Sequence, residues 1–164
     1  FAGLGDLEHV VYIGSFSKSL SASLRIGYIA CGLQLLEPLI RLKLLTSVAV
    51  PGFCERFVNT ILADGTYAKH TQAIQRQLMT HQQIAQKALM EYGWVFDVPA
   101  QGGMFLWVGH PEMPDLTAYI ERLEQQGILL MPGSSFAVDK DFKDRMRLNV
   151  AHLTQEVMPC LGWV

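Results

Sequence analysis

The sequence contains the stretch Tyr12-Ile13-Gly14-Ser15-Phe16-Ser17-Lys18, which is followed closely by Leu24-Arg25-Ile26-Gly27-Tyr28. Both segments have the apolar composition of short strands, and polar residues occupy the connection between them. One lysine, two serines and one arginine therefore fall at the end of one predicted strand and before the next. We interpret this connection as the most informative part of the chain for its chemistry.

The residue types in this connection suit a phosphorylated aldehyde. The unprotonated amine of Lys18 can form an imine with a carbonyl group. Ser15 and Ser17 offer hydroxyl donors to a phosphate, and Arg25 offers a guanidinium group in a two-pronged geometry. The implied cofactor is pyridoxal 5'-phosphate. Taken alone, however, a lysine flanked by serines between two strands can also be an ordinary solvated turn.

The spacing of these residues resembles the internal-aldimine motif of fold-type I pyridoxal-phosphate enzymes, the aspartate aminotransferase superfamily. In that motif Ser-x-Ser-Lys precedes Arg-x-Gly, as it does here over residues 15–27. The resemblance implies that Lys18 is the Schiff-base lysine and the catalytic residue. It also implies that Ser15, Ser17 and Arg25 bind the phosphate of the cofactor.

A second group of polar residues lies near the end of the chain. Asp144-Arg145-Met146-Arg147-Leu148-Asn149-Val150 alternates polar and apolar residues, which predicts a strand with Arg145, Arg147 and Asn149 on one face. An exposed edge strand has the same pattern. In the aminotransferase superfamily, an Arg-x-Asn at this place binds the α-carboxylate of the substrate, and the resemblance assigns that role to Arg147. A guanidinium suits it because its planar fork meets both carboxylate oxygens.

Two shorter motifs agree with the same family. Pro99-Ala100-Gln101-Gly102-Gly103-Met104-Phe105-Leu106-Trp107 resembles the Pro-x-x-Gly-Gly-x-Phe-x-Trp entry into a strand of the small domain. Leu130-Met131-Pro132-Gly133-Ser134-Ser135-Phe136 resembles a Pro-Gly-x-x-Phe loop at the substrate entrance. Glycine pairs are common in turns, so each motif alone is weak. The order of all four motifs along one chain is specific.

Hydrophobic periodicity divides the chain into three parts. Strands are predicted over 9–14 and 25–31 and helices over 33–45 and 51–62, with Pro38 tolerated only near a first turn. A long helix is predicted over 66–92, and strands over 94–98, 104–108, 128–131 and 145–150 follow, with a helix capped by Asp115 among them. We predict an α/β chain, and the resemblance implies that it is the C-terminal portion of a fold-type I pyridoxal-phosphate transferase. Residues 1–65 form the tail of the large-domain sheet, 66–92 the connecting helix and 93–164 a small α+β domain.

Composition excludes several other classes of function. The formal net charge of −2, with no basic run, provides no electrostatic footprint for nucleic acid. The three cysteines are widely spaced and lie among apolar residues, which favours reduced thiols over disulfides or a metal site. The longest candidate for a membrane span, residues 33–50, is interrupted by Glu37, Pro38, Arg41 and Lys43, so no membrane span is predicted. A cytoplasmic protein is expected.

The sequence of residues 11–28 most resembles the corresponding segment of the MocR-type bacterial regulators. These proteins join a GntR-class winged helix-turn-helix to an aminotransferase-like domain. Ser21-Ala22-Ser23 stands where many plain aminotransferases have Ala-Pro-Gly. The resemblance implies an effector-sensing domain that binds an amino acid or another amino compound. It implies a homodimer in the full-length protein and DNA contact only through a domain outside this chain.

Two alternatives stay open. The chain can belong to a metabolic aminotransferase of the aminoadipate, kynurenine or aromatic type, which performs ping-pong transamination, or it can be a degenerate domain kept for dimerisation. In the family, the carboxylate that contacts the pyridine nitrogen comes from a strand upstream of the lysine. We expect this strand to precede Phe1, and we expect residues 1–164 to be inactive as a transaminase by themselves.

Overall fold

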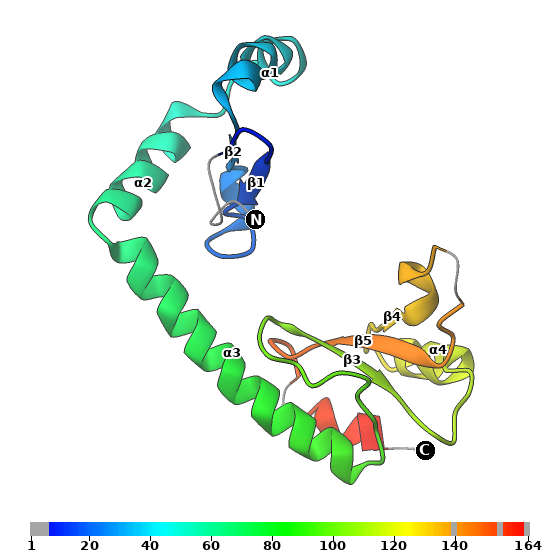
Figure 1. Ribbon diagram of the computed structural model, residues 1–164. Coiled ribbons are helices and arrows are strands. Elements are labelled where there is room, and N and C mark those ends of the chain that lie inside the picture. Colours follow the sequence, from blue (N-terminus) through cyan, green and yellow to red (C-terminus); the bar gives the residue numbers. More distant parts are fainter. Residues whose placement is uncertain (1–6, 139–140, 154–155, 163–164) are drawn as a thin grey trace. The chain divides into compact units, whose positions relative to one another are not determined.

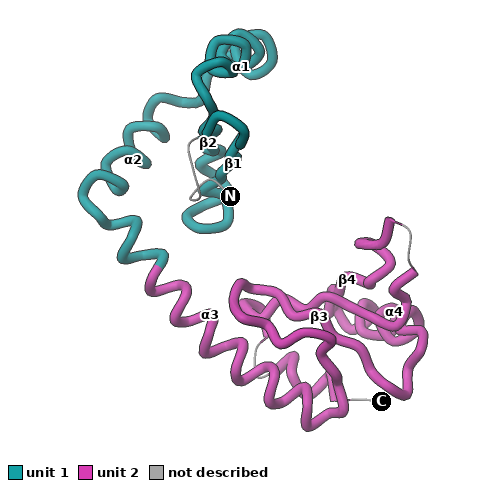
Figure 2. The backbone as a smooth tube through the Cα atoms, viewed as in Figure 1, with its two compact units in different colours: residues 1–71 teal, residues 72–164 magenta. Residues whose placement is uncertain are grey.

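The computed structural model describes residues 7–138, 141–153 and 156–162. The chain forms two compact units, residues 1–71 and residues 72–164, which Figure 2 distinguishes by colour. The boundary between them lies inside α3 (Thr66–Glu91), the longest helix of the described chain. Each unit has its own cluster of buried apolar residues.

The first unit is built on a two-stranded antiparallel sheet (Figure 1). β1 (Tyr12–Ser15) pairs with β2 (Gly27–Ala30), and Ser15 lies opposite Gly27. A short 3-10 helix, η1 (Ala22–Leu24), stands in the connection between the strands. A Cβ atom at Gly14 would collide with the ring of Tyr28, which is its partner on the neighbouring strand. The ring of Tyr28 therefore packs closely over Gly14.

Both strands are shorter than the sequence predicts. β1 begins at Tyr12 because residues 7–9 form a bend, and β2 begins at Gly27 because Arg25 adopts a left-handed conformation with φ 53°. Phe16 and Ile26 are buried with Val58 in a small core, and Phe16 donates its N–H to the carbonyl of Ile26 at 3.1 Å. The apolar pattern therefore locates the hairpin correctly but not its ends.

Two helices follow the hairpin, α1 (Leu33–Thr46) and α2 (Gly52–Ala63), close to their predicted ranges. Pro38 lies in the second turn of α1, beyond the first turn in which the sequence tolerates it. None of the residues of α1 is buried, although the helix is rich in leucine. Leu33 and Leu45 are 86% and 85% exposed, so α1 presents aliphatic side chains to its surroundings.

The helix α3 matches its predicted range within one residue at its C-terminal end. Its buried residues are Gln82, Ala85 and Leu89, all in the second unit. Ala85 and Leu89 are apolar, whereas Gln82 is a polar residue that is buried. In the described part of the chain, no helix is both long and apolar enough to cross a membrane.

The second unit contains a three-stranded antiparallel sheet in the order β3-β5-β4 (Figure 1). Its strands are β3 (Phe105–Gly109), β4 (Met131–Pro132) and β5 (Arg145–Asn149), with Trp107 and Met131 both opposite Arg147. Helix α4 (Thr117–Gln125) buries Tyr119, Ile120 and Leu123. The 3-10 helices η2 (Gly133–Phe136) and η3 (Met158–Gly162) complete the described elements of this unit.

Alternation along β3 and β5 separates the two faces of this sheet. Leu106, Val108, Met146 and Leu148 are buried in the core, together with residues of α3, α4 and η3. The opposite face carries Arg145, Arg147 and Asn149, as the sequence predicts for a strand.

Two predicted strands of this region are largely absent. Residues 94–98 make only an isolated bridge, Val95 to Gly109, because the chain bends at residues 97–98. The strand predicted over 128–131 is reduced to β4, since residues 128–130 are irregular. The indole N–H of Trp94 instead donates to the carbonyl of Leu161 at 2.8 Å, which anchors the segment after α3 to η3.

Candidate functional site

Lys18 lies in a tight turn directly after β1. The N–H groups of Leu20 and Ser21 both donate to the carbonyl of Phe16, at 2.9 and 3.1 Å, so the backbone from 17 to 20 makes one helical turn. Phe16, where the turn begins, is buried in the core of the first unit and anchors the turn. The side chain of Lys18 is exposed. The N–H of Ser17 donates to Oγ of Ser15 at 3.2 Å.

Tyr67 joins this turn to the first residues of α3. Its hydroxyl lies 2.7 Å from Oγ of Ser19, the residue after Lys18. Its ring also packs edge-on against Phe16, with the ring centroids 5.4 Å apart. The sequence predicts that Tyr67 lies in the helix over 66–92, and no motif indicated that it contacts the turn that carries Lys18.

Arg25 adopts a backbone conformation that L-residues rarely take. It ends η1 with φ 53° and ψ 36°, and its N–H donates to the carbonyl of Ala22 at 3.4 Å. A non-glycine residue in the left-handed region costs roughly 1–2 kcal/mol. Such outliers concentrate at functional sites, where the surrounding structure over-determines them. Arg25 precedes Ile26, whose carbonyl accepts from the N–H of Phe16 just beyond β1, and the side chain of Arg25 is exposed.

This donor set fits a phosphate group. Within the described residues, no hydrogen bond or ion pair engages Nζ of Lys18, Oγ of Ser17 or the guanidinium of Arg25. Oγ of Ser15 accepts from a backbone N–H, which leaves its own proton free to donate. Two hydroxyls and one guanidinium that have no acceptor among the described residues match the acceptor-only oxygens of a phosphate dianion. The residues present are therefore compatible with a phosphorylated cofactor attached at Lys18.

The second candidate group lies on the polar face of β5. The guanidinium carbon of Arg147 lies 4.1 Å from the ring centroid of Phe105 and 4.7 Å from that of Phe136. Among the described residues Arg147 makes no ion pair or hydrogen bond through its side chain. A half-buried cation with two aromatic neighbours and no carboxylate partner can receive an anion from outside the chain.

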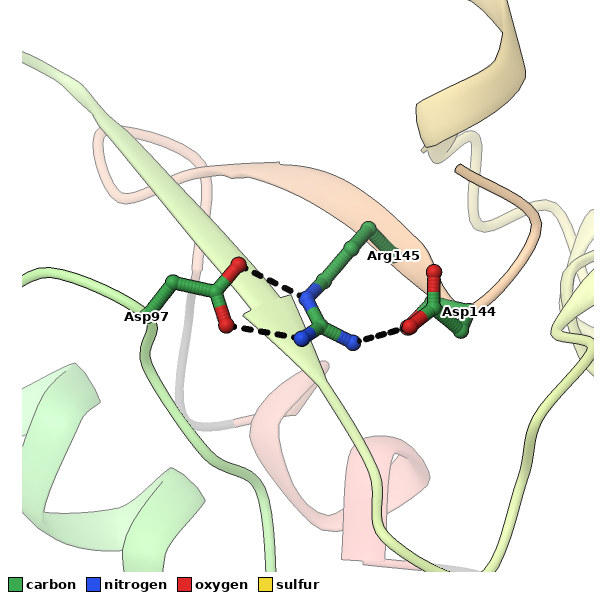
Figure 3. A network of polar contacts seen from close by, with 3 residues as sticks. All are labelled: Asp97, Asp144 and Arg145. Atoms are coloured by element: carbon green, nitrogen blue, oxygen red, sulfur yellow. Dashed lines mark hydrogen bonds and ion pairs between the residues drawn. The ribbon is translucent and has the colours of Figure 1, made fainter. Parts of the chain in front are cut away.

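Arg145 on the same face is occupied instead (Figure 3). Its Nε and Nη2 donate to the two carboxylate oxygens of Asp97 at 2.8 and 2.7 Å, and Nη1 donates to Asp144 at 2.6 Å. The hydrogen bonds from Arg145 hold the pKa of Asp97 below its usual range, and those to Asp97 raise the pKa of Arg145. Arg145 therefore fixes the bend at residue 97 to β5. Among the described residues, Arg147 is the arginine of β5 whose N–H groups have no acidic partner and can bind a ligand.

The structure places the five predicted site residues in two groups. Ser15, Ser17, Lys18 and Arg25 come together at one end of the hairpin in the first unit, whereas Arg147 belongs to the second unit. Sequence reasoning did not assign a role to the two phenylalanines around Arg147. Each stands at the phenylalanine position of a recognised motif, over 99–107 and 130–136, so the signal was present in the sequence.

Comparison with known proteins gives a consistent picture. The family model described as aminotransferase class I and II matches residues 1–161. The aromatic-amino-acid aminotransferase 1 of Thermococcus litoralis is 30% identical over 150 residues, which are 90% of this chain and 36% of that protein. The uncharacterized HTH-type transcriptional regulator YdfD of Bacillus subtilis is 29% identical over 151 residues, covering 90% of this chain and 31% of its own length. The chain thus spans about a third of the length of these curated relatives.

A solved structure agrees with the sequence comparison. The kynurenine aminotransferase of Pyrococcus horikoshii, crystallised in complex with PMP, superimposes with a TM-score of 0.84 at 26% identity. The match covers 97% of this chain and 40% of that structure. The mixed helix and strand architecture is therefore the architecture of a part of that fold.

Proposed function

Because this chain belongs to the aminotransferase class I and II family, we propose that it binds pyridoxal 5'-phosphate covalently through Lys18 and recognises an amino compound with its help. The observation that carries the proposal is the end of the hairpin. There an exposed lysine shares the connection between β1 and β2 with Ser17 and Arg25, whose side chains have no acceptor in the described structure. Arg25 also holds a left-handed backbone conformation, which costs a non-glycine residue free energy and is frequent at functional sites.

The roles of the residues follow from their chemistry. Ser15, Ser17 and Arg25 hold the phosphate group, the arginine through a charge-assisted pair. When bound, pyridoxal 5'-phosphate supplies an aldehyde for reversible covalent attachment and a ring that withdraws electrons. Nζ of Lys18 forms the attachment and, once released, is the group that can take up a proton from the Cα atom of the amino compound. Ser19 and Tyr67 keep the turn that carries Lys18 in place.

Arg147 is proposed to bind the carboxylate of the amino compound. Its guanidinium is half-buried and lacks an acidic partner among the described residues, in contrast to Arg145 on the same strand face. A fixed carboxylate orients the Cα–H bond of the ligand and so selects α-amino acids over simple amines. The domains proposed for this activity are residues 1–65 with the lysine, the helix over 66–92, and residues 93–164 with Arg147.

We propose that this module senses an effector in a MocR-type transcriptional regulator. Two observations support this assignment: the similarity to the HTH-type regulator YdfD and the serine-rich sequence of residues 15–23. In such a protein the DNA contact lies in another domain, and the aminotransferase-like part forms a homodimer. A metabolic aminotransferase is the second candidate, and the 30% identity to the Thermococcus litoralis enzyme favours it.

Covalent labelling tests the role of Lys18. The 164-residue chain is incubated with pyridoxal 5'-phosphate, reduced with borohydride and digested, and each lysine peptide is quantified by mass spectrometry. We expect the label at Lys18 to exceed that at Lys43, another exposed lysine of the first unit, and to be suppressed by inorganic phosphate. Lys18→Ala should remove the dominant label, and Lys43→Ala should leave it unchanged.

A further variant tests the phosphate site. Arg25→Gln removes one charge-assisted hydrogen bond, so the concentration of cofactor for half-maximal labelling should rise roughly tenfold or more. Equal labelling of Lys18 and Lys43, insensitive to phosphate, would show that the hairpin end is an ordinary turn.

A separate experiment distinguishes the sensor from the enzyme. In the complete reading frame that encodes this chain, a basic winged helix upstream of Lys18 would identify a regulator. The protein made from that frame should then change its affinity for promoter DNA when an amino acid is added. If the frame encodes no such domain and its protein transfers the amino group of an amino acid to a 2-oxo acid over many turnovers, the protein is a metabolic aminotransferase instead.

A further inference from the structure

Two aromatic rings surround the guanidinium of Arg147 and come from different parts of the second unit. Phe105 begins β3, in diagonal position to Arg147 across the β3-β5 pair, and Phe136 ends η2. Their ring centroids lie 4.1 and 4.7 Å from the guanidinium carbon. No aromatic contact among the described residues joins the two rings to each other, so the guanidinium is the group that they share.

The position of Phe136 is itself determined by the fold. Its ring packs edge-on against Trp107, with centroids 5.7 Å apart, and Trp107 lies opposite Arg147 in the strand register. Gly133 at the start of η2 is buried, and a Cβ atom there would lie 2.8 Å from the carbonyl oxygen of Arg145. The backbone of η2 therefore approaches β5 closely, and this approach brings Phe136 to Arg147.

Rings and carboxylates use different parts of a guanidinium group. Aromatic rings stack on its faces, whereas a carboxylate binds the N–H groups along its edge. Ring contacts also restrict a side chain that is otherwise highly flexible, so less freedom is lost when the ligand binds. We infer that Phe105 and Phe136 are positioning residues that hold the N–H edge of Arg147 ready for the carboxylate of the amino compound. This inference rests on the proposed function, because it presupposes that Arg147 binds a carboxylate.

Nuclear magnetic resonance of the 15N-labelled 164-residue chain tests the inference without the cofactor. The Nε–Hε resonance of Arg147, assigned through Arg147→Lys, should be shifted upfield by the two rings. Propionate is the carboxylate probe, and propionamide is its uncharged control. We expect propionate to move this resonance in a saturable manner and propionamide to leave it in place.

Substitutions then separate positioning from folding. Phe136→Leu and Phe105→Leu should each remove part of the upfield shift and weaken propionate binding roughly fivefold, the scale expected when one long side chain must be immobilised on binding. Both positions are more than a third exposed, at 42% and 41%, so the fold should tolerate leucine. Phe136→Tyr keeps a ring and should retain the wild-type affinity.

The matched control is Phe142→Leu. Phe142 also packs edge-on against Trp107, at 5.8 Å, but makes no cation–π contact with Arg147 among the described residues. Affinity that is unchanged in Phe136→Leu and Phe105→Leu, or reduced equally in Phe142→Leu, would overturn the positioning role while leaving the carboxylate role of Arg147 intact. An Arg147 resonance that ignores propionate in the wild-type chain would overturn both.

Discussion

Replacement of Tyr119 by phenylalanine should remove a specific alkaline instability of the second unit. Tyr119 is 5% exposed, and its hydroxyl lies 3.3 Å from the carbonyl oxygen of Leu161, which also accepts from the indole of Trp94. Burial raises the pKa of Tyr119 to about 12. The folded unit therefore keeps the phenol neutral at a pH where the unfolded chain has already lost the proton.

The sign and size of the effect follow from linkage. The raised pKa of Tyr119 gives stability that is fully present below about pH 10, the value of an unfolded tyrosine, and lost as the pH rises towards 12. At pH 11 the difference amounts to about 1.4 kcal/mol, one pKa unit, and the complete shift corresponds to about 2.7 kcal/mol. Tyr119→Phe should be nearly neutral at pH 7, because Trp94 still satisfies the carbonyl of Leu161.

Urea unfolding followed by tryptophan fluorescence measures this difference. The three tryptophans, at positions 94, 107 and 163, all belong to residues 72–164, so the signal reports the second unit. The free energies of unfolding of wild type and Tyr119→Phe should diverge between pH 9 and 11, with wild type losing more. Tyr92→Phe, at a half-buried tyrosine, serves as the control. Parallel pH profiles for wild type and Tyr119→Phe would refute the reasoning.

Three further outcomes are expected. Asp97→Asn should lower the free energy of unfolding by up to about 1 kcal/mol near neutral pH, since the pair with Arg145 is partly exposed. Because the pKa of Asp97 is lowered in the folded state, this stabilisation is present above about pH 4 and disappears as the pH falls through the folded pKa. Acid unfolding of wild type and Asp97→Asn should show this difference. Arg25→Gly should relieve the strain of the left-handed backbone and slow hydrogen exchange at the amide of Phe16 roughly twofold. The effect is this small because glycine loses more backbone freedom on folding than arginine does, which offsets part of the stabilisation. Faster exchange in the variant would show that the backbone of Arg25 is not strained. Gln82→Met should destabilise the second unit by about 1–2 kcal/mol in the same urea assay, because Nε2 of this buried residue donates at 3.0 Å to the carbonyls of both Gly102 and Gly103. An unchanged urea midpoint would show that water replaces both bonds.

The sequence predicted the arrangement of elements well where periodicity and buried apolar residues agree. The helix over 66–92 and the polar face of Arg145, Arg147 and Asn149 are confirmed by the structure. The family, confirmed by the match over residues 1–161, followed from the order of four motifs rather than from any single one. The roles of Ser15, Ser17, Lys18, Arg25 and Arg147 stay predictions that the labelling and titration experiments address.

The remaining differences have local physical causes that no pattern encodes. The predicted strand over 94–98 was wrong because the chain bends where Asp97 pairs with Arg145, a partner that is distant in sequence. Gln82 was overlooked because a polar residue on a helix is normally exposed, whereas here two backbone carbonyls compensate its burial. The hydrogen bond from Tyr67 to Ser19 likewise depends on the fold, since their separation in sequence carries no signal.

The uncovered leucines of α1 affect how preparations of this chain should be judged. Dyes such as ANS fluoresce on exposed apolar surface, and their signal is often taken as a mark of a molten globule. A properly folded sample of residues 1–164 should already give such a signal, because every residue of α1 lies at least partly at the surface. Quality control should therefore depend on near-ultraviolet circular dichroism and dispersed amide resonances, and dye fluorescence alone would lead a correct preparation to be discarded.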